Sequence, residues 1–172
     1  MTIETLQDPI TRLEPLQEKD FEALFRIAAD PLIWEQHPDH QRYREDVFRG
    51  YFDGAMASGT AFLIYDQATN ELIGCTRYYD HQPGQNSIAI GYTFLKRSHW
   101  GGAYNRSAKQ LLLDHAFRYV EQVFFHIGAA NIRSQMGTTR IGAVKCGETT
   151  MEINGQPQLH YEYVIRKADR HH

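Results

Sequence analysis

The sequence contains little cysteine, no long apolar run and no large excess of either charge. Two cysteines, Cys75 and Cys146, occur in 172 residues, far apart and outside any CxxC pattern, which predicts free thiols and a cytoplasmic protein. No stretch approaches the length of apolar chain that crosses a membrane, and the acidic start MTIETLQDP lacks the apolar core of a signal peptide. We therefore expect no membrane among its partners.

Charge and histidine content argue against two further classes of protein. The formal net charge is −3, so we expect no nucleic acid as the main partner. Nine histidines occur, but none forms an HExxH motif or a comparable cluster, so we predict no metal site. Two of them, His171 and His172, end the sequence and are either native residues or the remnant of a tag.

The sequence does contain alternating strand and helix patterns. Hydrophobic residues make up 42% of it, which suits a single domain over residues 1–172, with a core from about 10 to 165 and short flexible termini. The apolar spacing predicts helices over 18–29, 44–57, 104–120 and 131–141. It predicts strands over 10–16, 61–65, 71–79, 88–95, 123–129, 145–153 and 158–165, with hairpin turns at 67–70 and 154–155.

One segment carries the clearest functional pattern. The apolar run Ile88–Leu95 predicts a buried strand, a polar glycine-containing turn follows from Ser98 to Ala103, and an amphipathic helix begins at about Tyr104. A strand that leads through a glycine turn into a helix presents free backbone N–H groups at the positive end of the helix dipole. This arrangement predicts a phosphate-binding site, although an ordinary strand-to-helix turn has the same pattern.

This segment resembles the acetyl-CoA-binding segment of the GNAT superfamily of N-acyltransferases. The family turn is usually Gln/Arg-x-x-Gly-x-Gly/Ala, and here it reads Ser98-His-Trp-Gly-Gly-Ala103, so its first position departs. The order of elements from Ile10 to Ile165 also resembles the GNAT plan. Other matching segments are similar to the branch of ribosomal-protein N-terminal (alanine/serine) acetyltransferases: Ile90-Gly-Tyr-Thr93, Trp100-Gly-x-x-x-Asn105-x-x-x-Lys109, Gly74-Cys-Thr-Arg77, Asn131-x-x-Ser134 and Arg140-Ile-Gly-Ala143.

The resemblance implies an α+β fold, an α/β/α sandwich. Its central sheet would be mixed and mostly antiparallel, with about seven strands and about four flanking helices. It also implies acetyl-CoA as co-substrate, an amine acceptor as partner, and either a monomer or a homodimer. The residues that it places at the cofactor are Phe94, Leu95, Ser98, His99, Trp100, Gly101, Gly102, Ala103, Tyr104, Asn105, Asn131 and Ser134.

Several of these residues also have a purely structural interpretation. Trp100 suits a wall of the site better than a stacking partner, and Lys109 is either solvated or a phosphate contact. Asn131 is a good helix N-cap whether or not it touches the cofactor. By the resemblance, a backbone N–H near Thr93 would stabilise the developing oxyanion and the Ser134 hydroxyl would protonate the leaving thiolate, although a serine in a first helical turn can instead bond to local backbone.

A base is missing from its usual place. Relatives commonly carry a glutamate before the Ile-Gly of this strand, where this sequence has Ala89. At pH 7 the cost of deprotonating a lysine side chain exceeds that of an α-amine by about 3 to 4 kcal/mol. A site without a strong base therefore favours an α-amine, or another weakly basic amine, as acceptor. Replacement bases would be sought among His81, Asp80, Glu148, Glu152 and His99, each of which also fits another role.

The acceptor side is less clearly marked. Arg77 and Tyr78 face opposite ways on their strand, so one of them is expected to line the acceptor cleft, and relatives place Trp34 and His37 at its mouth. We predict an acetyl-CoA-dependent N-acetyltransferase that acts on a peptide N-terminal α-amine or a small-molecule amine. Two alternatives stay open: an acyl-CoA-binding or regulatory module with little turnover, and a transferase of a longer acyl group such as succinyl, with Arg77 near the acyl end.

Overall fold

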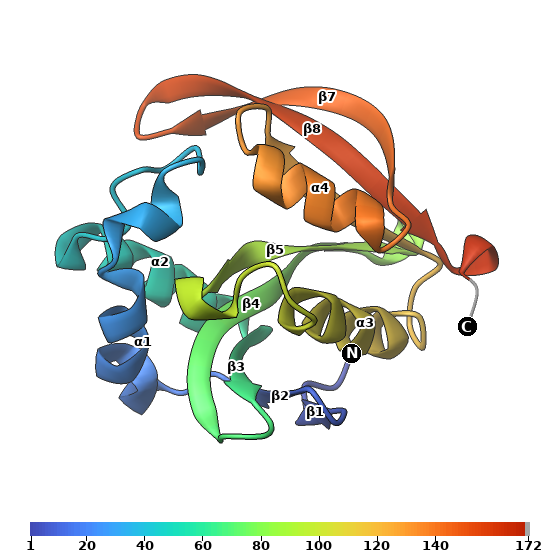
Figure 1. Cartoon of the computed structure of the whole chain (residues 1–172). Coiled ribbons are helices and arrows are strands. Elements are labelled where there is room, and N and C mark those ends of the chain that lie inside the picture. The colour runs from blue at the N-terminus through green and yellow to red at the C-terminus, as the bar shows by residue number, and fades with distance from the viewer. Residues whose placement is uncertain (171–172) are drawn as a thin grey trace.

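The computed structural model describes residues 1–170, so the predictions for His171 and His172 lie outside the described residues. Eight strands form one sheet in the order β1-β2-β3-β4-β5-β6-β8-β7 (Figure 1). The strands are β1 Leu6–Gln7, β2 Thr11–Pro15, β3 Ala61–Asp66, β4 Glu71–Gln82, β5 Ser87–Leu95, β6 Gln122–Gly128, β7 Val144–Ile153 and β8 Gln156–Arg166. The four α-helices are α1 Phe21–Ala28, α2 Glu45–Ser58, α3 Tyr104–Ala116 and α4 Ile132–Arg140.

Two apolar clusters pack on opposite faces of this sheet. Along β3, Phe62 and Ile64 join the cluster that contains Leu112 of α3, whereas Leu63 between them joins the cluster beneath α1 and α2. Successive strand residues point to opposite faces, so both faces of β3 are buried. The structure therefore confirms the mixed α+β fold with helices on both faces of the sheet (Figure 1).

The predicted elements are correct in kind and differ at their ends. The sheet has eight strands, because the short strand Leu6–Gln7 pairs with β2 and has no apolar pattern of its own. Helix α3 ends at Ala116 and not at 120, although Phe117 and Val120 remain buried. The apolar spacing thus continues beyond the helix into the turn that follows it. No helix within residues 1–170 is long and apolar enough to cross a membrane.

The sheet divides between β5 and β6. These two strands are parallel and pair only from Ser87 to Ala89, opposite Gln122 to Phe124. Beyond that point β5 continues to Leu95 beside β4, and β6 continues to Gly128 beside β8. The later halves of the two strands therefore leave backbone groups without a neighbouring strand in the middle of the sheet.

Candidate active site

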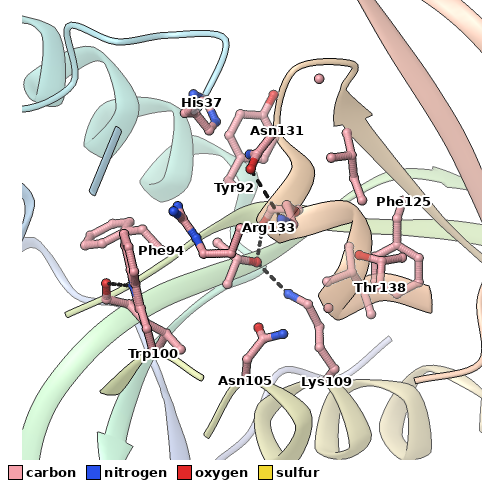
Figure 2. Close-up of a pocket in the computed structure, with 18 of the residues that line it drawn as sticks. His37, Tyr92, Phe94, Trp100, Asn105, Lys109, Phe125, Asn131, Arg133 and Thr138 are labelled. Carbon is pink, nitrogen blue, oxygen red and sulfur yellow. Dashed lines mark hydrogen bonds between the residues drawn. The ribbon is translucent and has the colours of Figure 1, made fainter. Parts of the chain in front are cut away.

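A cleft of about 960 Å³ lies where β5 and β6 separate. Its lining comes from β5, β6, the turn before α3, the first turns of α3, helix α4 and the segment that includes Trp34 (Figure 2). Twelve residues expected at the site line it: Trp34, His37, Thr93, Phe94, Leu95, Trp100, Gly101, Gly102, Ala103, Asn105, Asn131 and Ser134. Segments that are far apart in the sequence thus meet at the place where the sheet opens.

The glycine turn leaves the start of α3 open to the cleft. Gly101 has φ +73°, a left-handed conformation that favours glycine. Ala103 is the N-cap of α3 and makes no side-chain capping bond, so the first N–H groups of the helix have no partner within the helix. The indole of Trp100 donates to the Leu95 carbonyl over 2.8 Å and fixes the turn against the end of β5. The result is a helix N-terminus suited to an anion.

The charges around the cleft have one sign. Its lining includes Arg106, Lys109, Arg133 and Arg140, and no Asp or Glu among the residues that the structure describes. The guanidinium of Arg133 lies 3.7 Å above the Trp100 ring and donates to the Ile33 carbonyl, so its position is set by the protein. In a chain of net charge −3, this local excess of cations fits a polyanionic ligand such as a pyrophosphate.

Lys109 is a buried cation that the sequence pattern left undecided. Its side chain extends from α3 to Thr93, and its Nζ donates to the Thr93 hydroxyl over 2.7 Å (Figure 2). The Thr93 hydroxyl lies 2.8 Å from that of Thr76, and no carboxylate within residues 1–170 pairs with the lysine. Burial lowers the pKa of Lys109 to about 7. The solvated interpretation of Lys109 is therefore wrong.

The start of α4 forms the other wall. The Asn131 carboxamide accepts from the Ser134 N–H over 3.3 Å, which confirms Asn131 as the N-cap of this helix. Both side chains also line the cleft, so capping does not take Asn131 away from the site. No described partner is bonded to the Ser134 hydroxyl, which leaves that hydroxyl for a ligand.

Three predicted cofactor residues lie outside the lining. The His99 ring is 3.2 Å from an Asp66 carboxylate oxygen, the Ser98 hydroxyl bonds to the same ring, and the Tyr104 hydroxyl donates to Asp66. These three side chains are turned away from the cleft and anchor the turn to the end of β3. The sequence could not show this contact, because Asp66 precedes the turn by more than thirty residues.

Two predicted acceptor residues are also outside the lining. Tyr78 is fully buried beside α3, where its hydroxyl donates to the Leu112 carbonyl. Arg77 points to the opposite face, as predicted, and lies 3.4 Å from the Tyr92 ring centroid. Trp34 does line the cleft, with its indole bonded to the Ala28 carbonyl. Tyr92, which the sequence analysis did not select, separates Arg77 from the cleft.

The proposed replacement bases do not line the cleft. Neither His81, Glu148 nor Glu152 reaches it, and Asp80 lies at a separate small cavity. Three histidines do line it: His37, His126 and His160. Desolvation by burial lowers the pKa of His37 to about 3. His126 alternates with the buried residues Phe125 and Ile127 on β6, and this break in an apolar strand was the available sequence signal.

The fold and the site together are those of an acetyltransferase. The chain belongs to the GNAT acetyltransferase family, whose acetyltransferase (GNAT) domain model matches residues 11–144. A search of curated proteins found no match. Residues 1–170 contain no cluster of three or more His, Cys, Asp or Glu side chains placed to hold a metal ion.

Solved structures share the whole architecture. A candidate acetyltransferase from T. thermophilus is 26% identical and has a TM-score of 0.83, with 98% of this chain and 92% of that chain covered. RimJ of Mycobacterium smegmatis, solved in complex with CoA-disulfide, is 21% identical and has a TM-score of 0.73. The match covers 96% of this chain and 87% of the RimJ chain. An acetyltransferase from Salmonella typhimurium that modifies the N-terminal serine of ribosomal protein L7/L12 is 21% identical, with a TM-score of 0.79 and coverage of 95% of this chain and 99% of that chain.

Proposed function

We propose that this protein transfers an acetyl group from acetyl-CoA to a primary amine, either the α-amine of a peptide or protein N-terminus or the amine of a small molecule. The observation that carries the proposal is the cleft between β5 and β6, which joins an uncapped helix N-terminus to four cationic side chains and to unpaired strand edges. The phosphate end of acetyl-CoA would bind at the helix N-terminus and the cationic side chains. Its amide-containing arm would pair with the strand edges.

The residues of the cleft fit the parts of acetyl-CoA. The turn Gly101–Ala103 and the guanidinium of Arg106 would hold the pyrophosphate, since small residues let phosphates approach the backbone. The edge of β5 from Thr93 to Leu95 has no strand on its β6 side and would pair with the amides of the pantetheine arm. Acetyl-CoA supplies an activated thioester; the protein supplies its orientation.

The transfer itself requires two events at the carbonyl. The neutral amine attacks the thioester carbon while a backbone N–H near Thr93 stabilises the oxygen, a C–N bond forms and the C–S bond breaks. The Ser134 hydroxyl, which lines the cleft from α4, is the proposed proton donor to the departing thiolate. Both reactants held in one cleft gain rate from proximity and orientation.

The lack of a carboxylate in the described lining supports an α-amine as acceptor. No carboxylate lines the cleft within residues 1–170, so deprotonation of a lysine ammonium would be costly. The description of the Salmonella enzyme, which acts on an N-terminal serine, points to the same acceptor class. Arg77, the residue expected near the end of a longer acidic acyl group, lies outside the lining, and we propose acetyl as the transferred group.

Calorimetric titration of acetyl-CoA tests the donor site first. We expect micromolar binding that Gly101→Glu abolishes, because a carboxylate and a side chain would occupy the phosphate turn. Gly84→Glu is the matched control, since a Cβ there meets nothing within 4 Å and the residue lies outside the cleft. Mass spectrometry of peptide N-termini and free amines after incubation then tests transfer. Binding without transfer to any amine would leave an acyl-CoA-binding module.

A further inference from the structure

Three polar side chains form a chain of hydrogen bonds beside the cleft. The Tyr79 hydroxyl on β4 lies 2.6 Å from His126 Nδ1, and His126 Nε2 lies 2.8 Å from Glu162 Oε2 on β8. The side chain of His126 is 13% exposed and that of Glu162 is 35% exposed. The chain of bonds therefore runs from a largely buried phenol to a carboxylate in contact with solvent.

The register of the sheet places this group at the point where β5 and β6 separate. Ala89 is the last residue of β5 that pairs with β6, with Tyr79 opposite it on β4 and Phe124 opposite it on β6. His126 is two residues beyond Phe124, so its side chain is on the same face, just inside the open part of the sheet. It lines both the cleft and a second cavity of about 170 Å³, which Ala89 and Glu162 also line.

The ring of Tyr79 is held against the cleft wall. A Cβ added to Gly91 would lie 2.8 Å from the Tyr79 ring carbon Cε1 and 3.5 Å from its hydroxyl oxygen, so the phenol lies directly over Gly91. Gly91 lines the cleft, and Tyr92 packs edge-on against Tyr79 with ring centroids 5.2 Å apart. Tyr79 is not itself among the residues that line the cleft, so its phenol, fixed behind Gly91, would exchange protons with the cleft through a water molecule.

We propose that Tyr79, His126 and Glu162 form the proton relay that deprotonates the acceptor amine; the proposal rests on the acetyl transfer proposed above. A proton of the ammonium passes through a water molecule in the cleft to the Tyr79 oxygen as the phenol proton passes to His126 Nδ1. His126 releases its Nε2 proton to Glu162, which gives it to bulk water, and the imidazole returns to its starting tautomer by proton exchange with solvent. The neutral amine attacks the thioester, and its second proton passes through the Ser134 hydroxyl to the thiolate, so one proton in total is released to solvent.

No other described group in the cleft combines access with a carboxylate partner. Burial lowers the pKa of His37 to about 3, and its Nδ1 accepts from the Asp39 N–H. His160 bonds to the Gln158 carbonyl, which cannot take up a proton. Lys109 bonds only to the Thr93 hydroxyl. Among the described residues, the relay alone connects the cleft to a solvent-exposed anion.

Charged and titratable groups face the relay from every neighbouring strand. Strand β4 contributes Tyr79 and Asp80, β5 contributes Tyr92, and β8 contributes Glu162. Strand β7 contributes Cys146, and the sulfur of Cys146 lies 3.5 Å from Glu162 Oε1. The nearest charged partner of the imidazole is the Glu162 carboxylate, 2.8 Å from His126 Nε2.

The test compares kcat/KM at about pH 6.5 and pH 9.5, with one peptide acceptor whose α-amine has a pKa near 8. For His126→Gln and Tyr79→Phe we expect a loss of about 100-fold at the lower pH, the usual range of general base catalysis. At the higher pH the amine is already neutral, so the loss should fall below about tenfold. His81→Gln, at the exposed end of β4, is the control and should match the unmodified protein at both pH values.

Two control measurements make the outcome decisive. Thermal unfolding should show that each variant is folded at the assay temperature, and the affinity for acetyl-CoA should be unchanged, because the relay lies away from the phosphate turn. A loss that is equal at both pH values would indicate a structural defect and overturn the relay, as would full activity of His126→Gln. If the unmodified protein binds acetyl-CoA and acetylates no amine, the proposed function fails and the relay fails with it.

Discussion

At the scale of the residue, Lys109 shows how a buried basic group in the cleft carries a cost in stability. The ammonium is buried with one hydroxyl as partner, and desolvation lowers its pKa from 10.5 to about 7. An unfolded lysine keeps its proton up to about pH 10.4. Between these values the unfolded chain binds more protons than the folded chain, so the penalty is complete below about pH 7 and disappears as the pH rises toward about 10.

We predict that Lys109→Met raises the free energy of unfolding by about 1–3 kcal/mol near pH 6, because an apolar chain of similar length needs no partner there. The difference from the unmodified protein should shrink steadily between about pH 7 and pH 10. Urea denaturation across this range measures it, with acetyl-CoA affinity followed in parallel and expected to fall. A difference that stays constant with pH would show that the lysine is not buried as a charge.

At the scale of the element, the contact between β4 and β5 is close because of one glycine. A Cβ at Gly74 would lie 2.1 Å from the backbone oxygen of Phe94, which no side-chain rotation can relieve. Phe94 lies on the part of β5 that lines the cleft and packs on Trp34. This close contact holds β5 against β4 in the part of β5 that does not pair with β6. The same part of β5 contains a bulge next to Tyr92.

We predict that Gly74→Ala lowers the free energy of unfolding by about 2–4 kcal/mol, since backbone must shift to accommodate the methyl group. Gly50→Ala is the contrasting variant: Gly50 lies inside α2 and a Cβ there meets nothing within 4 Å. There the gain in helix propensity should raise stability by about 0.5–1 kcal/mol. Chemical denaturation of both variants measures the free energy of unfolding. Equal changes in Gly74→Ala and Gly50→Ala would contradict the close contact at Gly74.

At the scale of the whole molecule, charge is distributed unevenly. The chain carries a net charge of −3, yet the cleft lining has four cations and no carboxylate among the described residues. An anionic donor would therefore be attracted to the cleft while the remaining surface repels it weakly. Such attraction is reduced by salt, because at about 0.15 M ionic strength charges more than about 8 Å apart in solvent are largely screened.

We predict that the dissociation constant of acetyl-CoA rises severalfold between about 50 and 500 mM NaCl. Arg106→Gln and Arg140→Gln should each weaken binding at low salt and flatten this dependence, since each removes one cation from the lining. Arg118→Gln is the matched control, because Arg118 lies after α3, pairs with Glu4 and is outside the cleft. Calorimetry at three salt concentrations measures the effect, and an affinity independent of salt would refute the electrostatic contribution.

Local sequence patterns were sufficient for the elements and for the glycine turn. The strand from 88 to 95, the turn at Gly101 and the N-cap Asn131 depend on neighbours within a few residues, so periodicity and capping rules predict them. The ends of elements were less predictable. Apolar residues such as Val120 stay buried after the helix has ended, and spacing alone cannot mark that change.

The sequence by itself determined the family, the order of the elements and the turn that opens α3. Only the tertiary structure decided which side chains reach the cleft. It turned His99 toward Asp66, buried Tyr78 beside α3 and joined Tyr79, His126 and Glu162 across three strands. The reason is physical: each of these contacts joins residues far apart in the chain, and strand register brings them together without any mark in the local sequence.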